Sequence, residues 1–324
     1  MVLLVAAACS SDDLPLSDGQ PSTGIGPSTP VSVQGTGVEV GAKPWSVAYD
    51  PEAGRLYTAN EADNSVSVVD AASLQVLDTL PAGVGPTEVA VNPTTARVYV
   101  INAFSDDMTV IDGSTNTVIA TVDVGQAPSD LVVDQEANLI YVSNLRSNEV
   151  LIIDGVTNTV ERRLSAVEEP AALALLPAAG ILYVGATGAL HAVDLTSGEI
   201  VATVLLEDRV SAIAIDPALG LIYAVAPDSG TVSIIELETH DVVATLPVGR
   251  VPQAVAVDAS AGLAYVVNTF DNSLSVIDGQ ARLVLATVRA GLMPQDVAIA
   301  DDGSLLYVAS SGTSEILVLQ APGS

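Results

Sequence analysis

Three acidic residues have types and positions that could do chemistry: Glu88, Asp130 and Asp296 each stand two residues after a proline. We expect them at the start of strands that approach a common axis. Carboxylates that converge there from separate strands could hold Ca²⁺ through oxygen ligands. A hydrated channel mouth accounts for the same residues and is the interpretation we favour. No other cofactor is expected.

A second candidate group interrupts loops that otherwise hold small residues. It comprises Trp45, Phe104, Arg146, Arg209, Arg250 and Phe270. Exposed aromatic and arginine side chains are typical of binding surfaces. The loop at residues 186–189 is also two residues short, which predicts a notch in the rim beside residues 208–210. Ordinary loop variation accounts for the same features and is the interpretation we favour.

Few other residues of the sequence are candidates for catalysis. We interpret His191 as a structural histidine and His240 as a solvated residue of a hairpin turn. Neither is expected near an axis, where a haem ligand would have to lie. Trp45 is the single tryptophan, whereas quinone-type sites use several. No phosphate loop, Ser/His/Asp set or cysteine–histidine cluster is present.

All these candidates lie within a repeat marked by tyrosine. The tyrosines fall at 57, 99, 141, 183, 223, 265 and 307, in steps of 42, 42, 42, 40, 42 and 42 residues. Seven copies at this period predict a repeat architecture. Each copy holds four short β segments, the first of which follows a proline in six of the seven copies. A small residue four positions after that proline, such as Ala48 or Ala256, indicates an innermost strand in a crowded place.

Acidic residues recur at the ends of the first and third segments, where turns must follow. We therefore interpret ten of them as structural: Asp50, Asp134, Asp216, Asp258, Asp70, Asp112, Asp154, Asp194, Glu236 and Asp278. Asx side chains bond to the backbone of their own turn.

Repeated four-stranded antiparallel sheets make the blades of a β-propeller, and closing the ring protects the exposed strand edges. The seventh copy holds only three segments before the chain stops. Residues 31–40 alternate as a strand and can supply the fourth. We therefore predict an all-β, seven-bladed propeller whose ring is closed by an N-terminal strand.

The amino-acid composition excludes some classes of binding partner. With 10 basic and 39 acidic residues the formal charge is −29, which repels nucleic acids and anionic lipid surfaces. We therefore expect no nucleic-acid partner and no membrane contact except through a lipid anchor. We also expect a monomer. The single cysteine, Cys9, leaves no intrachain disulfide and no cysteine metal cluster.

The N-terminal nine residues are apolar, then small, and end at Cys9. They resemble the end of a bacterial lipoprotein signal, which implies lipidation at Cys9; an incidental cysteine in a frayed terminus is the alternative. Residues 10–30 are rich in Ser, Asp, Gly and Pro, which is typical of a flexible tether. The predicted domains are thus a signal-like segment (1–9), a tether (10–30) and a propeller (31–324), in a protein held at the cell envelope, periplasmic or surface-exposed.

The end of the tyrosine strand carries a family resemblance. Tyr99-Val-Ile-Asn102, Tyr141-Val-Ser-Asn144 and Tyr265-Val-Val-Asn268 are similar to the motif of the YVTN-repeat (YncE-like) β-propellers. The resemblance covers residues 31–320 and implies a secreted or envelope-attached propeller, often a surface protein or binding module. One branch of the family binds single-stranded DNA, which the charge of this chain argues against. Related propellers include lactonases and haem- or quinone-dependent oxidoreductases.

These observations support two hypotheses. The first is a non-catalytic envelope protein that binds a protein, peptide or glycan ligand through its loop-rich face. The alternative is a metal-dependent hydrolase of the lactonase type that uses the axial carboxylates, which would need an open coordination position on the metal.

Overall fold

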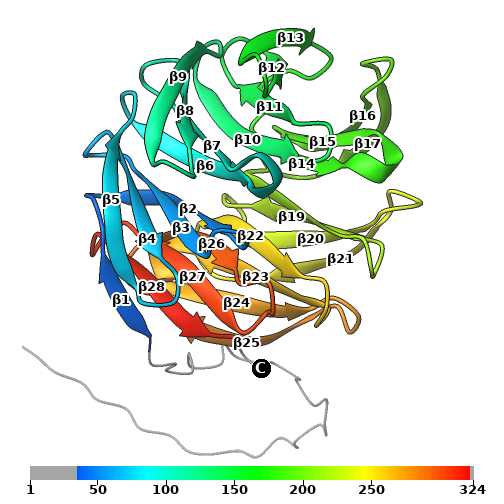
Figure 1. The fold of residues 1–324 in the computed structure, drawn as a ribbon. Helices are drawn as coiled ribbons and strands as arrows, with labels where there is room; N and C mark the ends of the chain where they lie inside the picture. Colours follow the sequence, from blue (N-terminus) through cyan, green and yellow to red (C-terminus); the bar gives the residue numbers. More distant parts are fainter. Residues whose placement is uncertain (1–34, 322–324) are drawn as a thin grey trace, which may run out of the picture.

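The structure, a computed structural model, describes residues 35–321. The predicted lipidation site, the tether and residues 31–34 lie outside the described residues. Within them, 28 strands form seven four-stranded antiparallel sheets, and three short 3₁₀ helices are the only helices. The sheets stand around a common centre as the blades of a propeller (Figure 1). The predicted fold class is confirmed.

Each blade has the same order of strands from the axis outward. The innermost strands are β2 (Pro44–Asp50), β6 (Pro86–Asn92), β10 (Pro128–Asp134), β14 (Ala172–Leu176), β18 (Ala212–Asp216), β22 (Pro252–Asp258) and β26 (Pro294–Ile299). The second strands, which carry the tyrosines, are β3 (Arg55–Asn60), β7 (Arg97–Asn102), β11 (Leu139–Asn144), β15 (Ile181–Ala186), β19 (Leu221–Ala226), β23 (Leu263–Asn268) and β27 (Leu305–Ser310).

In each blade the outermost strand is more exposed than the third strand. The third strands are β4 (Ser65–Asp70), β8 (Asp107–Asp112), β12 (Glu149–Asp154), β16 (Ala189–Asp194), β20 (Thr231–Glu236), β24 (Ser273–Asp278) and β28 (Glu315–Gln320). The outermost strands are β5 (Gln75–Pro81), β9 (Thr117–Asp123), β13 (Thr159–Leu164), β17 (Ile200–Leu205), β21 (Val242–Pro247), β25 (Leu283–Arg289) and β1 (Thr36–Glu39). The 3₁₀ helices are η1 (Pro93–Thr95), η2 (Pro177–Ala179) and η3 (Thr269–Asp271).

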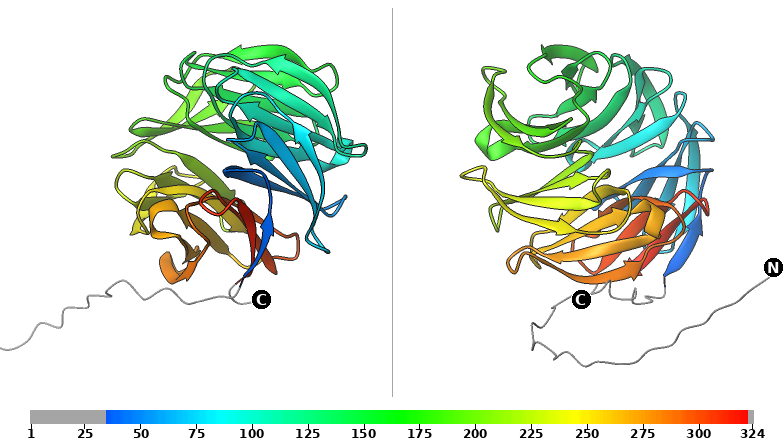
Figure 2. Two further views of the ribbon diagram at one scale, coloured as in Figure 1. Left: turned by 90° about the vertical axis from the view of Figure 1, so that its left-hand side faces the viewer. Right: turned by 180° about the vertical axis from the view of Figure 1, so that it is seen from behind.

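We number the blades along the chain, so that blade 1 is β2–β5, blade 6 is β22–β25, and blade 7 is β26–β28 completed by β1. Strand β1 pairs antiparallel with β28, with Val38 opposite Ile316. The N-terminal strand therefore completes the last blade, as the sequence predicts. Figure 2 shows this closure from two further sides, with the blue strand beside the red one.

The core lies between the blades. All seven repeat tyrosines are buried, and the apolar clusters join neighbouring blades. In one cluster Tyr57 and Val68 of blade 1 pack with Val89 and Val98 of blade 2. Burial of a large apolar side chain stabilises a fold by about 2 kcal/mol, so the blade boundaries are the main source of stability. Because the core is built from these boundaries, the axis itself is free to carry polar residues.

Two sets of loops form one face of the ring, which we call the loop face. One set, the proline loops, runs from the outermost strand of a blade to the innermost strand of the next. The other joins the second and third strands. Backbone hydrogen bonds pair the two sets, as between Phe104 N and Val84 O (3.1 Å) and between Phe270 N and Arg250 O (3.2 Å). The pairing holds the loops in defined positions.

Candidate functional site at the axis of the ring

The innermost strands begin with an irregularity that directs side chains toward the axis. In five blades the pairing with the second strand skips the residue after the proline, as between Pro44 and Ser46. Such a bulge leaves one residue unpaired and re-aims its side chain. The residues at the bulges are Trp45, Thr87, Ser129, Gln253 and Gln295. Blades 4 and 5 lack the bulge, because β14 and β18 begin later, at Ala172 and Ala212.

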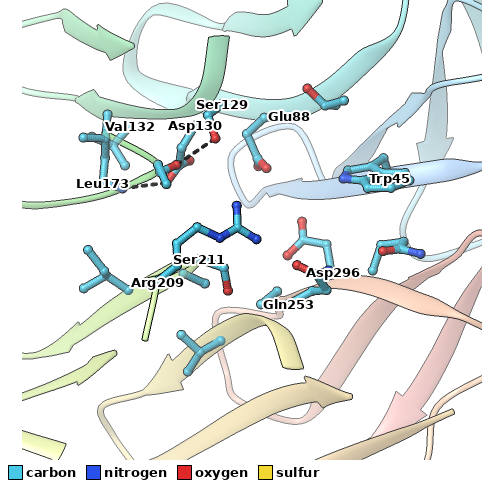
Figure 3. Close-up of a pocket in the computed structure, with 17 residues that line it drawn as sticks. Trp45, Glu88, Ser129, Asp130, Val132, Leu173, Arg209, Ser211, Gln253 and Asp296 are labelled. Carbon is cyan, nitrogen blue, oxygen red and sulfur yellow. Dashed lines mark hydrogen bonds between the residues drawn. The ribbon is translucent and has the colours of Figure 1, made fainter. Parts of the chain in front are cut away.

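A cavity of about 320 Å³, which we call the axial cavity, lies among these strand starts. Its shape depends on which residue each blade carries two positions after the proline. In blade 5, where Val210 replaces the proline, the position is counted from Val210. Blades 4, 5 and 6 carry Ala172, Ala212 and Ala254 there. Of these, Ala212 and Ala254 line the cavity, and blade 4 lines it with Ala171 and Leu173. The other four blades carry the polar residues Ser46, Glu88, Asp130 and Asp296. The three acids predicted to converge therefore do so, on one side of the axis (Figure 3).

Two of the acids also hold adjacent blades together. Asp296 Oδ2 of blade 7 accepts the N–H of Val47 in blade 1 at 2.9 Å. Asp130 Oδ2 of blade 3 accepts the N–H of Leu173 in blade 4 at 2.7 Å. Each of these aspartates also accepts the N–H of the residue that follows it. A structural role thus accounts for both.

Glu88 does not form such a link to the next blade. The equivalent N–H in blade 3, that of Leu131, donates to Asp130 Oδ1 instead (2.7 Å). Glu88 turns back toward blade 1, where its Oε1 lies 2.7 Å from Ser46 Oγ. Of the three acids, Glu88 is therefore the one whose carboxyl group is least accounted for by the packing of the blades.

The contacts of Ser46 favour a proton on one of the acids. Ser46 is fully buried, and its Oγ lies 2.7 Å from Glu88 Oε1 and 2.9 Å from Asp296 Oδ2. A serine hydroxyl has one proton to donate. If Glu88 is protonated, its O–H donates to Ser46 Oγ, and Ser46 donates to Asp296. The second lone pair of Ser46 Oγ accepts the N–H of Val89 at 3.3 Å.

The pKa shifts of the three acids agree with a proton on Glu88. Burial raises the pKa of Glu88 well above its ordinary value, and the charges of Asp296 and Asp130 raise it further. Burial also raises the pKa of Asp130 to about 7, against the lowering effect of its hydrogen bonds from Leu173 and Leu131. The pKa of Asp296 is raised by burial as well. Like charges at close range cannot all ionise easily, so the cavity favours the protonated form of these carboxyl groups.

Two residues of the predicted binding surface join the acids at this cavity. Trp45 lines it from blade 1, with 38% of its surface exposed. Arg209 enters from the proline loop before blade 5, and its guanidinium points into the space between the carboxyl groups (Figure 3). No ion pair of Arg209 is found within residues 35–321. Arg209 is the one basic residue among those that line the cavity.

The remaining predicted binding residues lie elsewhere on the loop face. Phe104 and Phe270 stand at loop tips with 69% and 55% of their surface exposed. Arg250 is engaged, because its Nε donates to Asp271 Oδ1 at 2.6 Å and its Nη2 to Phe270 O at 2.9 Å. Arg146 lines a separate hollow of about 460 Å³ with Glu168 and Glu169. The six predicted residues therefore do not form one site.

The short loop of blade 4 lies between two hollows. Thr187 lines the hollow that holds Arg146. On the other side, Leu206 and Asp208 line a second cavity of about 440 Å³, and both bond to Gly188 of the short loop. The rim is thus hollowed where the deletion predicts a notch.

The hydrogen bonds of the turn acids and of the two histidines test the structural roles predicted for these residues. The nine turn aspartates accept backbone N–H groups of their own turns, as Asp50 does from Glu52, and Glu236 accepts the hydroxyl of Thr239. His191 bonds to Thr203, as a structural histidine should. The interpretation of His240 as solvated needs correction. Its Nε2 lies 3.1 Å from the hydroxyl of Tyr183 in the neighbouring blade, because the hairpin turn folds against that blade.

Sequence reasoning missed the polar residues that complete the cavity, chiefly Thr87, Ser211 and the two glutamines, and also Ser46, which contacts two of its acids. An alignment of the seven copies at the two positions that follow each proline could have identified them.

Within residues 35–321 no group of three or more His, Cys, Asp or Glu side chains is arranged to hold a metal ion. The calcium hypothesis stays a prediction. No helix in this part of the chain is long and apolar enough to cross a membrane.

Comparison with known proteins agrees with the fold and the repeat. The family model of the YNCE-like beta-propellers matches residues 34–135. Over these residues the chain is similar to the YNCE-like β-propellers. The predicted family resemblance is thereby confirmed, and the matched part includes Trp45 and Glu88. No curated protein matches the chain.

The chain is also similar to a solved structure. The structure titled Kuenenia stuttgartiensis hydrazine synthase superposes with a TM-score of 0.79 and 21% sequence identity, over 91% of this chain and 100% of that one. At this identity the likeness shows the fold alone.

Proposed function

We propose that this YNCE-like propeller is a non-catalytic binding module of the cell envelope, whose ligand is a protein, peptide or glycan bound on the loop face. The observation that carries the proposal is the exposure of Phe104 and Phe270 on loops that backbone hydrogen bonds hold in place. Val84, Leu292 and Met293, on the same face, are also exposed. Apolar side chains on a rigid, otherwise polar face mark interaction sites, because their placement needs little ordering on binding.

The envelope location rests on the N-terminal sequence. Lipidation of Cys9 would hold a monomeric propeller at a membrane through the residue 10–30 tether, without membrane contact by the propeller itself. Metabolic labelling with an alkyne fatty acid tests this: the wild type should be labelled and the Cys9→Ser variant should not. Equal labelling of both, or of neither, would remove the anchor from the proposal.

The binding role is tested with a phage-displayed peptide library and a glycan array, both probed with the purified protein. The double variant Phe104→Ala/Phe270→Ala should bind the selected ligands at least about tenfold more weakly. The matched control is Leu77→Ala/Leu285→Ala, which removes two similarly exposed apolar side chains from the outermost strands. Equal losses in both double variants, or none in either, would count against the loop face.

The hydrolase alternative is supported by the convergence of Glu88, Asp130 and Asp296 at one cavity. It requires a bound metal. Metal analysis of the purified protein, together with the melting temperature before and after chelation, decides the matter. A stoichiometric metal and a fall in melting temperature on chelation would favour the hydrolase over the binding module.

A further inference from the structure

We infer that the cavity of about 440 Å³ between blades 4 and 5 binds a primary carboxamide, the side chain of an asparagine or glutamine in a peptide ligand. This inference rests on the proposed binding function and names the group that the peptide would present. We call this space the interblade cavity. Residues of the proline loop before blade 5 line it, so it opens at the rim of the loop face.

Other blades show which group fills the equivalent place. In blades 1, 2 and 6 the second strand ends in an asparagine whose amide nitrogen donates to two oxygens of the third strand. In blade 6, Asn268 Nδ2 donates to Ser273 Oγ at 3.2 Å and to Ser275 Oγ at 2.9 Å. Asn268 Oδ1 accepts the N–H of Gly249 in the proline loop at 2.8 Å. The equivalent bonds of the amide nitrogen run from Asn60 to Ser65 and Ser67, and from Asn102 to Asp107 and Thr109.

Blade 5 keeps the two oxygens but lacks the asparagine. Thr231 and Ser233 occupy the two third-strand positions, opposite Ala226 and Ala224 of β19. Ala226 stands in the place of the asparagine, and Ala224 stands where five other blades carry valine. All four residues line the interblade cavity. The cavity therefore lies where the repeat elsewhere places a carboxamide.

The hydroxyl of Ser233 is a second, independent indication of a ligand. Ser233 is only 8% exposed, and it lines the cavity. Its side chain has no hydrogen-bond partner within residues 35–321, whereas Thr231 Oγ1 lies 2.8 Å from Ser229 Oγ. Buried hydroxyls are nearly always paired, so a group in the cavity is expected to bond to this one. Glu207, at the place of Gly249, also lines the cavity, and its N–H has no acceptor in the described part of the chain.

A primary carboxamide suits these partners better than other groups do. Its nitrogen carries two N–H donors for the two hydroxyls, and its oxygen can accept the N–H of Glu207. The acetamido group of a glycan has one N–H and cannot serve both hydroxyls. A carboxylate would find no basic residue among those described as lining the cavity, and Glu207 and Asp208 would repel it. Leu205, which is 81% exposed, can cover the apolar part of the peptide.

The test is isothermal titration of the full chain with Ala-Ala-Asn-Ala-Ala, acetylated at one end and methyl-esterified at the other, so that asparagine supplies its one primary carboxamide. The aspartate and leucine analogues should bind at least about tenfold more weakly. Ser233→Ala should weaken binding of the asparagine peptide about fivefold and leave the melting temperature unchanged, because its hydroxyl has no partner to lose. The matched control, Ser275→Ala in blade 6, should leave binding unchanged and lower the melting temperature, because Asn268 loses a hydrogen bond.

A double variant fills the cavity from within. Ala226→Asn/Glu207→Gly recreates the arrangement of blade 6, and the glycine is needed because a Cβ at Gly249 would lie 2.6 Å from the Cβ of Asn268. This variant should no longer bind the asparagine peptide, and it should melt at a higher temperature than the wild type because the new amide pairs with Ser233. Undiminished binding by the folded double variant, or equal binding of the three peptides, would overturn the inference.

N-Acetylglucosamine tests the glycan alternative in the same titration. Its binding in place of the asparagine peptide, lost in Ser233→Ala, would overturn the inference in favour of an acetamido site. If the asparagine peptide does not bind but Phe104→Ala/Phe270→Ala still loses the ligands selected from the library, the binding function stands and this inference alone fails.

Discussion

Ser46 Oγ lies 2.7 Å from Glu88 Oε1 across the boundary between blades 1 and 2. The same oxygen is within hydrogen-bond distance of Asp296, so its single proton cannot serve both acids. A proton on Glu88 would link the packing of the first two blades to the charge of the axial cavity. The stability of the fold should therefore depend on the protonation of Glu88.

The first prediction concerns stability and pH. Because the pKa of Glu88 is raised in the folded protein, folding favours its protonated form. That contribution is complete below the ordinary pKa and is lost as the pH rises through the folded value. We expect the melting temperature of the wild type to fall between pH 5 and pH 8, and that of Glu88→Gln to fall less, by a few degrees.

Asp130, whose pKa is raised to about 7, acts with the same sign, so the fall should not vanish completely in this variant. The turn acids should not contribute to the change in melting temperature between pH 5 and pH 8. Hydrogen bonds from Ser73 lower the pKa of Asp70, and its contribution is lost only at pH values below this window. Identical pH slopes for Glu88→Gln and wild type would show that Glu88 ionises freely. Glu168→Gln is the charge-matched control.

The second prediction concerns backbone strain in a proline loop. Val251, just before Pro252, has a φ of 52°. A β-branched residue in this region is strained by about 1–3 kcal/mol. Gly85 holds the equivalent place in blade 2. Val251→Gly keeps the carbonyl that accepts from Thr269 N and should stabilise the protein by about 1 kcal/mol.

This change should appear as a melting temperature about 2–4 °C higher. The control is Val255→Gly, in the extended strand β22, where glycine only adds freedom to the unfolded chain and removes packing. Val255→Gly should lower the melting temperature. A decrease in Val251→Gly as well would mean that the loop is not strained.

The third prediction concerns closure of the ring. Removing residues 31–40 deletes β1, exposes the edge of β28 and uncovers the neighbours of the buried Val38. We expect the melting temperature to fall by about 10 °C or more. Removing residues 10–28 should change it little. Equal melting temperatures for the two truncations would contradict closure by the N-terminal strand.

The sequence predicted the fold well because the fold is periodic. The tyrosine spacing identifies seven blades, and the missing last strand points to residues 31–40. The position of Glu88, Asp130 and Asp296 at the axis followed from the same period. The cavity could not be predicted in this way, because it depends on where the repeat fails. Ala212 and Ala254 line the space in two adjacent blades, and Ser46 meets Glu88 across 42 residues of chain. Likewise, the contact of His240 with Tyr183 crosses a blade boundary that local sequence does not reveal.

The fourth prediction concerns the packing of neighbouring blades. Gly279, in the turn after β24 of blade 6, faces the buried hydroxyl of Tyr223 in blade 5. A Cβ at Gly279 would lie 2.2 Å from this oxygen, and 3.3 Å from the carbonyl of Gly262. Gly279→Ala should therefore force the turn away from blade 5 and destabilise the protein by about 1–3 kcal/mol.

Gly113 is the matched comparison, because it faces Tyr57 in the same way between blades 1 and 2, with a Cβ that would lie 2.9 Å from the hydroxyl. Gly113→Ala should cost less, so the melting temperatures should rank wild type, Gly113→Ala and then Gly279→Ala. Since both variants add one methyl group at equivalent turns, the difference between them reports how closely the blades approach. The reverse order, or no loss in either variant, would show that the tyrosines do not set that approach.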